Sequence, residues 1–310
     1  MAEQRPIIAS SVIRAIDIIG DRWTLYILRD AFLGSRRYFE WKTRLNISDA
    51  VLSNRLRKLV GAGCLAKQQS STSETHEEYY LTDQGLDLYH VLICLWHWDT
   101  SWNPNRERTT RLVHQTCGEA TVPIVACGHC KEPVRACDIE FAEGAGVGID
   151  NNAPVRRRRT RKSDLLDIVG NEALTILGDR WSALLVACSF LGLRRFKELQ
   201  ERMGIPPHQL SVRLKELVAS GILERSLYQE HPPRHEYRLT GKGRDFYPVI
   251  LMLMVWGDRW LSQPDGPPVI LRHRPCGVVL DPVMYCGDCG KPIDRRNVYL
   301  DFSEESEAVV

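Results

Sequence analysis

Eight histidine and cysteine side chains follow one spacing pattern that the chain contains twice. Each copy has a His-x2-Cys pair followed, after nine intervening residues, by a Cys-x2-Cys pair. The residues are His114, Cys117, Cys127 and Cys130, and then His273, Cys276, Cys286 and Cys289. Three thiolates and one imidazole can fill all four positions around a tetrahedral zinc ion, which leaves none for a reactive water. The pattern therefore predicts two structural zinc sites, each formed by the four ligands of one copy.

Two other interpretations of these cysteines stay open, namely a disulfide and a ribbon that has kept its shape without a metal. Cys137 could replace the histidine in the first copy, whereas the second copy has no counterpart of Cys137. A hydrolytic zinc enzyme is a weaker interpretation, because both sites are closed. Since no glycine-rich phosphate loop, Ser-His-Asp order or paired carboxylate cluster stands out, we expect the protein not to be an enzyme.

A second group of side chains could contact the bases of DNA. A recognition helix buries one stripe of residues and presents short polar or cationic side chains to the major groove, especially near its N-terminus. Two segments have this pattern, and an amide such as that of Asn54 or Gln209 can pair with adenine, while Arg57 could contact guanine or phosphate. The outward residues are Ser48, Asp49, Ala50, Ser53, Asn54 and Arg57 in the first segment and His208, Gln209, Ser211, Val212 and Lys215 in the second.

Further arginines could contact the phosphate backbone, which positions a protein on DNA without specifying sequence. They are Arg36, Arg37, Arg194 and Arg195 before the two segments, Arg234 after the second, and Arg156, Arg157, Arg158 and Arg159 in a run with six positive charges in seven residues. The net charge is only +2, so any affinity for DNA must come from local basic surface.

Self-comparison shows that the chain is a repeat with an offset of 158 residues. Gly20 to Trp23 recurs as Gly178 to Trp181, and the three cysteines of each metal pattern correspond after a one-residue insertion. A period of this length indicates a duplicated domain. The predicted units are a winged helix-turn-helix domain at 8–104, a zinc-ribbon-like tail at 105–141, a basic linker at 142–163, a second winged helix-turn-helix domain at 164–263, and a second tail at 264–303.

Hydrophobic periodicity gives the same order of elements in each copy. Apolar residues at helical spacing predict helices over 23–32, 38–45 and 48–59, and over 207–217 in the second copy. Extended pairs on either side of a polar tip then predict a hairpin. The segments 86–98 and 246–256 are apolar almost all round, so we expect helices covered on two sides. The fold class is mainly α with small β-hairpins (α+β), in two tandem domains that each precede a small β unit.

The sequence resembles the HxlR family of bacterial winged helix-turn-helix transcriptional regulators. The resemblance rests on the stretch from Arg14 to Phe32 and on Pro232 to Thr240, and it covers about 10–102 and 168–261. It implies a DNA-binding regulator, usually a homodimer held by its terminal helices, with recognition helices at 48–59 and 207–217. Some members sense oxidants through a cysteine near the start of the domain. This chain has Ser10 and Ile168 at those places, so that route is not expected.

Because the chain carries two such domains, we expect an intramolecular pseudo-dimer that binds double-stranded DNA at a bipartite operator with unlike half-sites. A small-molecule effector is expected to control it, although no residue identifies that ligand. The sequence leaves open whether whole chains also dimerise. The alternative is a zinc-stabilised protein-interaction module that has lost DNA binding.

Composition is consistent with either function. A chain of 310 residues with 44% hydrophobic and 26% charged residues is typical of a globular protein with roughly two domains. The longest apolar stretch is far shorter than the ~20 residues that cross a bilayer, and the polar start does not resemble a secretory signal. We therefore expect a cytoplasmic protein without a membrane partner.

Overall fold

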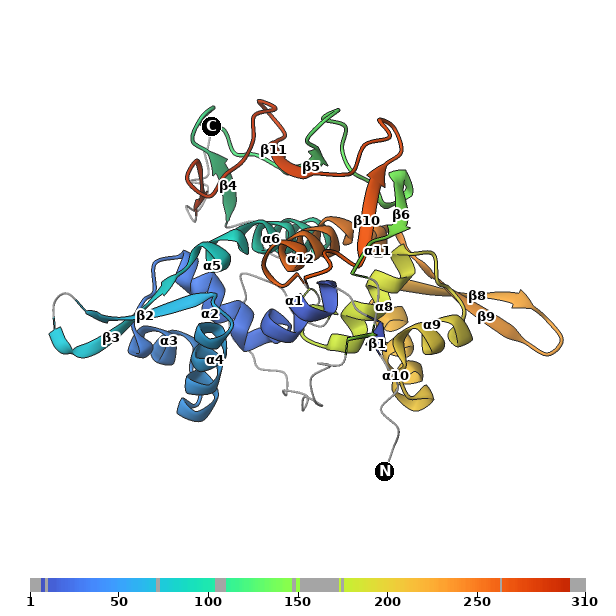
Figure 1. Cartoon of the computed structure of the whole chain (residues 1–310), viewed down its shortest axis with the longest axis horizontal. Helices are drawn as coiled ribbons and strands as arrows, with labels where there is room; N and C mark the ends of the chain where they lie inside the picture. The colour runs from blue at the N-terminus through green and yellow to red at the C-terminus, as the bar shows by residue number, and fades with distance from the viewer. Residues whose placement is uncertain are drawn as a thin grey trace, which may run out of the picture.

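The same order of helices and paired strands occurs in both halves of the computed structural model (Figure 1). The structure describes residues 7–8, 11–70, 73–103, 110–146, 149–150, 173, 176–262 and 264–301. The basic linker residues Arg156, Arg157, Arg158 and Arg159 lie outside these ranges, so their contact with DNA stays a prediction. No helix in the described part of the chain is long and apolar enough to span a membrane.

The first half begins with helices whose ends follow from local sequence. Asp21 caps α2 because its carboxylate accepts a hydrogen bond from the backbone N–H of Thr24 at 3.1 Å. Gly34 follows the end of α2 with a φ of +98°, a conformation that favours glycine. The helices and strands are α1 (Ser11–Ile19), α2 (Arg22–Phe32), α3 (Tyr38–Leu45), α4 (Asp49–Gly61), β2 (Leu65–Ser70), β3 (Ser73–Leu81), α5 (Asp83–Asp87) and α6 (Tyr89–Trp102).

The second half repeats these elements from α8 onward. Asp179 caps α8 by accepting from the backbone N–H of Ser182 at 3.0 Å, and Pro207 occupies the first turn of α10, where a missing N–H costs nothing. The elements are α8 (Arg180–Phe190), α9 (Phe196–Met203), α10 (Pro207–Ala219), β8 (Leu223–Gln229), β9 (Arg234–Leu239), α11 (Gly241–Arg244) and α12 (Tyr247–Trp260). The predicted fold class is confirmed. The segment 86–98, predicted as one helix, is divided between α5 and α6.

Each wing is an antiparallel hairpin at the end of its half. Leu65 pairs with Leu81 in the first wing and Leu223 with Leu239 in the second. In the first half a further bridge joins Arg37 to Glu78, which ties the loop before α3 to the wing. Figure 1 shows the two wings extending to opposite ends of the molecule.

The strands that follow α6 and α12 pair between the two tails. The first tail contains β4 (Arg111–His114), β5 (Pro123–Cys127), the 3-10 turn η1 (Ala136–Asp138), and β6 (Ile139–Glu143); the second contains β10 (Val269–His273), β11 (Pro282–Cys286) and β12 (Val298–Asp301). The three pairs are β4 with β12, β5 with β11, and β6 with β10. Val125 lies opposite Met284, its own counterpart in the repeat, so an approximate twofold axis passes between these strands.

One further pair, β1 (Ile7–Ile8) with β7 (Ile149–Asp150), joins the start of the chain to the segment predicted as the linker.

Buried helices join the two halves. Helix α12 packs against both α1 and α6, as expected for helices that are apolar almost all round. The indole N–H of Trp98 donates to the carbonyl of Lys242 at 3.0 Å, and that of Trp256 donates to the carbonyl of Gln84 at 2.9 Å. Both pairs of positions are 158 residues apart, so the same contact is made in each direction across the axis. The tryptophans are therefore core residues that connect the halves.

Candidate nucleic-acid interface and metal clusters

Helices α4 and α10 lie on the side of the molecule opposite the paired tail strands (Figure 1). In α4, Leu52, Leu56 and Leu59 are buried, while Asn54 and Arg57 are exposed. Ser48, Asp49 and Ala50 are also exposed and Ser53 is half-buried. The burial stripe thus leaves a polar face at the N-terminal half of the helix, as the recognition-helix prediction requires.

Helix α10 has the same stripe but a different outer face. Leu210, Leu214 and Leu217 are buried, and His208 and Lys215 are exposed. The remaining candidate contacts are half-buried; they are Gln209, Ser211 and Val212. Because imidazole, amide and ammonium groups replace the amide and guanidinium of α4, the two helices present different hydrogen-bonding groups.

An aspartate and an arginine hold each of these helices in place, a role that the sequence analysis missed. The N-cap Asp21 of α2 receives the Nε–H of Arg55 from α4 at 2.8 Å. In the second half Asp179 receives two hydrogen bonds from Arg213 of α10, at 2.8 and 3.0 Å. In each half one carboxylate therefore caps one helix, α2 or α8, and also holds the candidate recognition helix, α4 or α10, through the arginine. The signal was present, because both residues recur at the repeat offset.

Burial tends to raise the pKa of Asp179, but hydrogen bonds and the charge of Arg213 outweigh it, so the pKa of this carboxyl lies below its usual value. The carboxylate is thus ionised near neutral pH and the ion pair is maintained.

The first half has an additional polar network that has no counterpart in the described part of the second half. The Asp49 carboxylate accepts from the Lys42 ammonium at 2.8 Å and from the Tyr38 hydroxyl at 3.0 Å, and these hydrogen bonds lower the pKa of Asp49. The equivalent positions in the second half are Pro207, Gln200 and Phe196. Within the protein the Asp49 side chain joins α3 to α4, and because Asp49 is exposed its predicted contact with DNA stays a prediction.

The arginines before α3 and α9 lie against the wings. The guanidinium of Arg36 is 4.9 Å from the ring centre of Tyr80, and that of Arg195 is 4.7 Å from the ring centre of Tyr228. The Nε–H of Arg37 donates to Glu78 at 3.0 Å. Arg194 and Arg234 are also exposed, the latter at the start of β9. Stacking keeps each charge at the surface while limiting the positions that the side chain can adopt, an arrangement suited to a phosphate contact.

The eight candidate metal ligands form two compact clusters, but not in the predicted grouping. One cluster contains His114, Cys117, Cys286 and Cys289, and the other contains Cys127, Cys130, His273 and Cys276. Each cluster combines the His-x2-Cys pair of one tail with the Cys-x2-Cys pair of the other. The prediction that the four ligands of one tail share a site is therefore wrong. The cause is that β4, β5 and β6 pair with strands of the second tail rather than with one another.

The distances within each cluster fit a tetrahedral ion. In the first cluster the Nδ1 of His114 is 3.5 Å from the sulfur of Cys117 and 3.3 Å from that of Cys289, and the sulfurs of Cys117 and Cys286 are 3.9 Å apart. Bonds of about 2.3 Å to sulfur and about 2.0–2.1 Å to nitrogen put tetrahedral ligand atoms roughly 3.5–3.8 Å apart.

The second cluster has almost the same geometry. The Nδ1 of His273 is 3.4 Å from the sulfur of Cys276 and 3.3 Å from that of Cys130, and the sulfurs of Cys127 and Cys276 are 3.9 Å apart. All ten cysteines are free thiols, so the disulfide interpretation does not apply to these residues. Cys137 is exposed and belongs to neither cluster.

The surroundings of Cys286 favour the thiolate that a metal binds. Burial raises the pKa of its thiol, but a hydrogen bond from the Thr121 hydroxyl at 3.1 Å and bonds from the backbone of Cys289 and Asp288 outweigh it. The result is a pKa of about 6. Because Thr121 belongs to the first tail, the two tails cooperate in shaping this cluster beyond its four ligands.

Comparison with known proteins gives one family and several relatives. The HxlR-like helix-turn-helix model matches residues 18–107 and 176–265, together more than half of the chain. An uncharacterized HTH-type transcriptional regulator of Mycobacterium tuberculosis is 48% identical over 126 residues, which cover 41% of this chain and 80% of that protein. The uncharacterized HTH-type transcriptional regulator YdeP of Bacillus subtilis is 34% identical over 93 residues, covering 30% and 73% of the two chains. The crystal structure of diamide-treated YodB from Bacillus subtilis is 36% identical, covers 29% of this chain and 89% of that chain, and has a TM-score of 0.26.

Proposed function

The chain belongs to the HxlR-like helix-turn-helix family, a family of transcriptional regulators rather than enzymes, and on that premise we propose that its two halves act together as one sequence-specific DNA-binding unit. The observation that carries the proposal is the pair of polar helix faces, on α4 and α10, on one side of the molecule (Figure 1). Each helix would enter a major groove, and two successive grooves on one face of DNA are roughly 34 Å apart.

The two halves form a pseudo-dimer in this proposal. Support comes from the reciprocal tryptophan hydrogen bonds and from the strand pairs between the tails. Tethering makes the second DNA contact intramolecular and so increases the overall affinity. Because Asn54 and Arg57 differ from Gln209 and Lys215, the operator is expected to consist of two unlike half-sites.

Zinc is the metal that best suits the two clusters, since three sulfurs and one nitrogen in tetrahedral geometry are a typical structural zinc site. His114, Cys117, Cys286 and Cys289 would hold one ion, and the other four ligands would hold the second. When bound, the ion supplies structural cross-linking and no reaction. Each ion would join one tail to the other and thereby fix the spacing of the DNA-binding halves.

A small molecule would control the affinity for DNA, which requires that it bind two conformations of the protein unequally. The support is a cavity at the junction of the two halves, described below.

The proposal is tested by selecting genome fragments with the purified full chain at two salt concentrations. We compare the wild type with an Asn54→Ala/Arg57→Ala variant and with a Gln209→Ala/Lys215→Ala variant. A good bidentate base contact is worth about 1–3 kcal/mol, or roughly a 5- to 150-fold change in affinity. Each variant should therefore lose selectivity at one half-site and keep it at the other.

Arg296→Gln is the matched control, because Arg296 is an exposed arginine in the second tail, away from α4 and α10. It removes one positive charge without touching either polar helix face, so the selected site should not change. A perfectly symmetric selected site would contradict the unlike half-sites. Folded, zinc-loaded protein without any salt-sensitive DNA binding would instead favour a zinc-stabilised protein-interaction module.

A further inference from the structure

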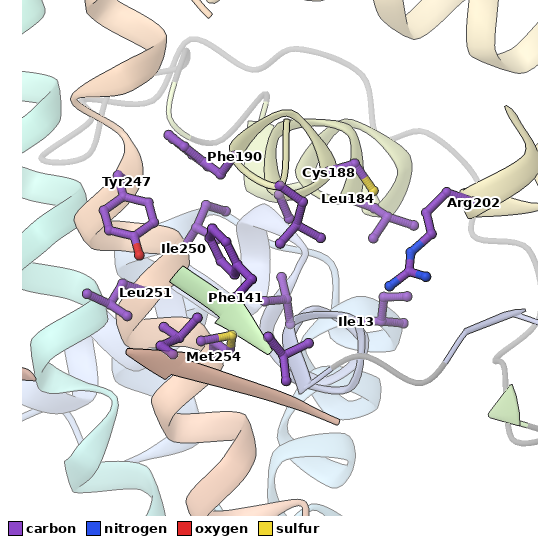
Figure 2. Close-up of a pocket in the computed structure, with 15 residues that line it drawn as sticks. Ile13, Phe141, Leu184, Cys188, Phe190, Arg202, Tyr247, Ile250, Leu251 and Met254 are labelled. Atoms are coloured by element: carbon purple, nitrogen blue, oxygen red, sulfur yellow. The ribbon is translucent and has the colours of Figure 1, made fainter. Parts of the chain in front are cut away.

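An apolar cavity lies where the two halves and their tails meet (Figure 2). Its enclosed volume is about 70 Å³, and the space that also counts the part open to solvent is about 720 Å³, so only a compact ligand would fit. The first half contributes Ile13 of α1, and the first tail contributes Phe141 of β6. The second half supplies most of the remaining wall, from α8, α9, α12 and β10. A ligand there would contact both halves at once.

Two polar groups belong to this otherwise apolar wall. The guanidinium of Arg202, in the last turn of α9, extends toward Ile13 in Figure 2, and Tyr247 of α12 lies at the other end of the view. Tyr247 is only 4% exposed, and its hydroxyl has no hydrogen-bond partner among the described residues. Arg202 is exposed, and its side chain has no ion pair within the described part of the chain, so its charge lies where the cavity meets solvent. A missing partner is unfavourable for the buried hydroxyl of Tyr247, and a ligand can relieve that cost.

The first half shows what such an arginine contacts when its partner is part of the chain. Arg44, the repeat equivalent of Arg202, is 3.9 Å from the carboxylate of Asp30. Asp30 is fully buried and also pairs with Arg29 at 2.7 Å. In the second half the positions of Arg29 and Asp30 are occupied by alanine and by Cys188. The second half has thus kept the arginine and replaced the buried anion.

Cys188 does not supply a substitute charge. Burial raises the pKa of its thiol to about 12, even though the nearby charge of Arg202 acts in the opposite direction. The thiol therefore stays neutral near pH 7, and the space beside Arg202 has apolar walls and a positive end.

We propose that this cavity binds a compact apolar molecule that carries one carboxylate, with the carboxylate at Arg202 and the apolar body between α8, α12 and Phe141. The ligand supplies the anion that Asp30 supplies in the first half. An arginine fork matches the geometry of a carboxylate with two parallel hydrogen bonds, and the apolar wall suits an apolar body attached to that carboxylate.

The position of the cavity links such a ligand to the DNA-binding face. Arg202 lies shortly before α10, and the N-cap of α8 is Asp179, whose carboxylate accepts from Arg213 of α10. On the opposite wall, Phe141 pairs with Leu271, two residues before the metal-cluster residue His273. A ligand between these walls would change the angle between α10 and the paired tails. This regulatory consequence rests on the proposed function, whereas binding at the cavity does not.

The site is tested by titration calorimetry on the zinc-loaded full chain without DNA. The probes are phenylpropanoate, phenylacetate and octanoate, each paired with its uncharged amide of the same shape. We expect at least one acid to bind with a dissociation constant below about 1 mM and its amide to bind much more weakly. Replacing the guanidinium in Arg202→Gln should weaken binding of the acid at least about tenfold, because a hydrogen bond to a charged group is lost.

Arg44→Gln is the matched control, since it removes the equivalent arginine from the half that contains Asp30, and it should leave acid binding unchanged. Cys188→Asp places a carboxylate beside Arg202 and should abolish acid binding. If that variant does not fold, the Arg202→Gln variant still shows whether the acid binds at Arg202. The proposal is overturned when no acid of the panel binds, when acid and amide bind equally, or when both arginine variants have the same effect.

A separate measurement addresses regulation. The acid that binds best is added to the complex of the protein with its selected operator, and an altered DNA affinity supports control through this cavity. Acid binding with unchanged DNA affinity would refute the regulatory role. Because calorimetry is done without DNA, failure of the site and failure of DNA binding give different results.

Discussion

The exchange of metal ligands between the tails can be tested by counting metal ions in two double variants. Cys117 and Cys289 belong to one cluster, whereas Cys117 and Cys130 belong to different clusters. In Cys117→Ala/Cys289→Ala one cluster loses two ligands and the other keeps all four. In Cys117→Ala/Cys130→Ala each cluster loses one ligand and neither is complete. The two variants remove the same number of thiols, so overall thiol content cannot explain a difference between them.

The expected zinc contents follow directly from this geometry. After dialysis against a weak chelator, the wild type should hold two ions per chain, the Cys117→Ala/Cys289→Ala variant one, and the Cys117→Ala/Cys130→Ala variant none. Because a structural zinc site contributes on the order of 10 kcal/mol of binding free energy, the second variant should also be the less stable in denaturant unfolding. Plasma mass spectrometry of gel-filtered protein gives the counts, and Cys137→Ala, which changes an exposed cysteine outside both clusters, should retain two ions.

The opposite result would refute the reasoning. If each tail held its own ion, the Cys117→Ala/Cys130→Ala variant would keep one ion and the Cys117→Ala/Cys289→Ala variant none. That pattern would mean that the strand pairs between the tails do not form in solution.

Two further predictions concern the positions of helices. Arg213→Met removes both hydrogen bonds to Asp179 and should lower the free energy of unfolding by about 1.5–3 kcal/mol. The lowered pKa of Asp179 contributes stability above the pKa of the unfolded carboxyl and loses it as pH falls through the lower folded value. The variant should therefore lose less stability than the wild type on acidification below about pH 4, and an equal acid response in urea titrations would contradict this. Gly257→Ala should destabilise the protein by about 1–3 kcal/mol, because an added Cβ would lie 2.4 Å from the backbone oxygen of Ser11. Gly61→Ala is the control, since nothing lies within 4 Å of a Cβ added there. Equal thermal midpoints of the two variants would argue against the close approach of α12 to α1.

Much of the fold followed from local patterns in the sequence. Apolar residues at helical spacing placed α3 at its observed bounds, and α4 and α10 within two residues at each end. The capping role of Asp21 was also predictable, because a side chain three residues from its N–H partner needs no information from elsewhere in the chain. The division between α5 and α6 was missed, since both segments have apolar residues at compatible spacing.

The identities of the metal-ligand candidates could be recognised from spacing, but their grouping could not. Spacing shows that Cys117 and the pair at Cys127 and Cys130 are near enough in the chain to share an ion. It shows nothing about the candidate ligands of the second tail, which lie about 150 residues further along the chain. The pairing of β5 with β11 brings the ligands of the second tail next to those of the first. The sequence also did not reveal the difference between the halves at the cavity. The replacement of Asp30 by Cys188 matters only because Arg202 lies beside an apolar space, and that position is known only from the tertiary structure.

The sequence by itself determined that this protein is a duplicated HxlR-like helix-turn-helix chain with two sets of candidate metal ligands and two unlike candidate recognition helices. These properties depend on which residues occur and on their spacing along a helix or strand, where neighbours lie within a few residues. Only the tertiary structure decided which tail completes which metal cluster and where the arginine of the second half is left without an anion. Both depend on contacts between segments far apart in the chain, and packing of the whole core selects those contacts from many that local spacing allows.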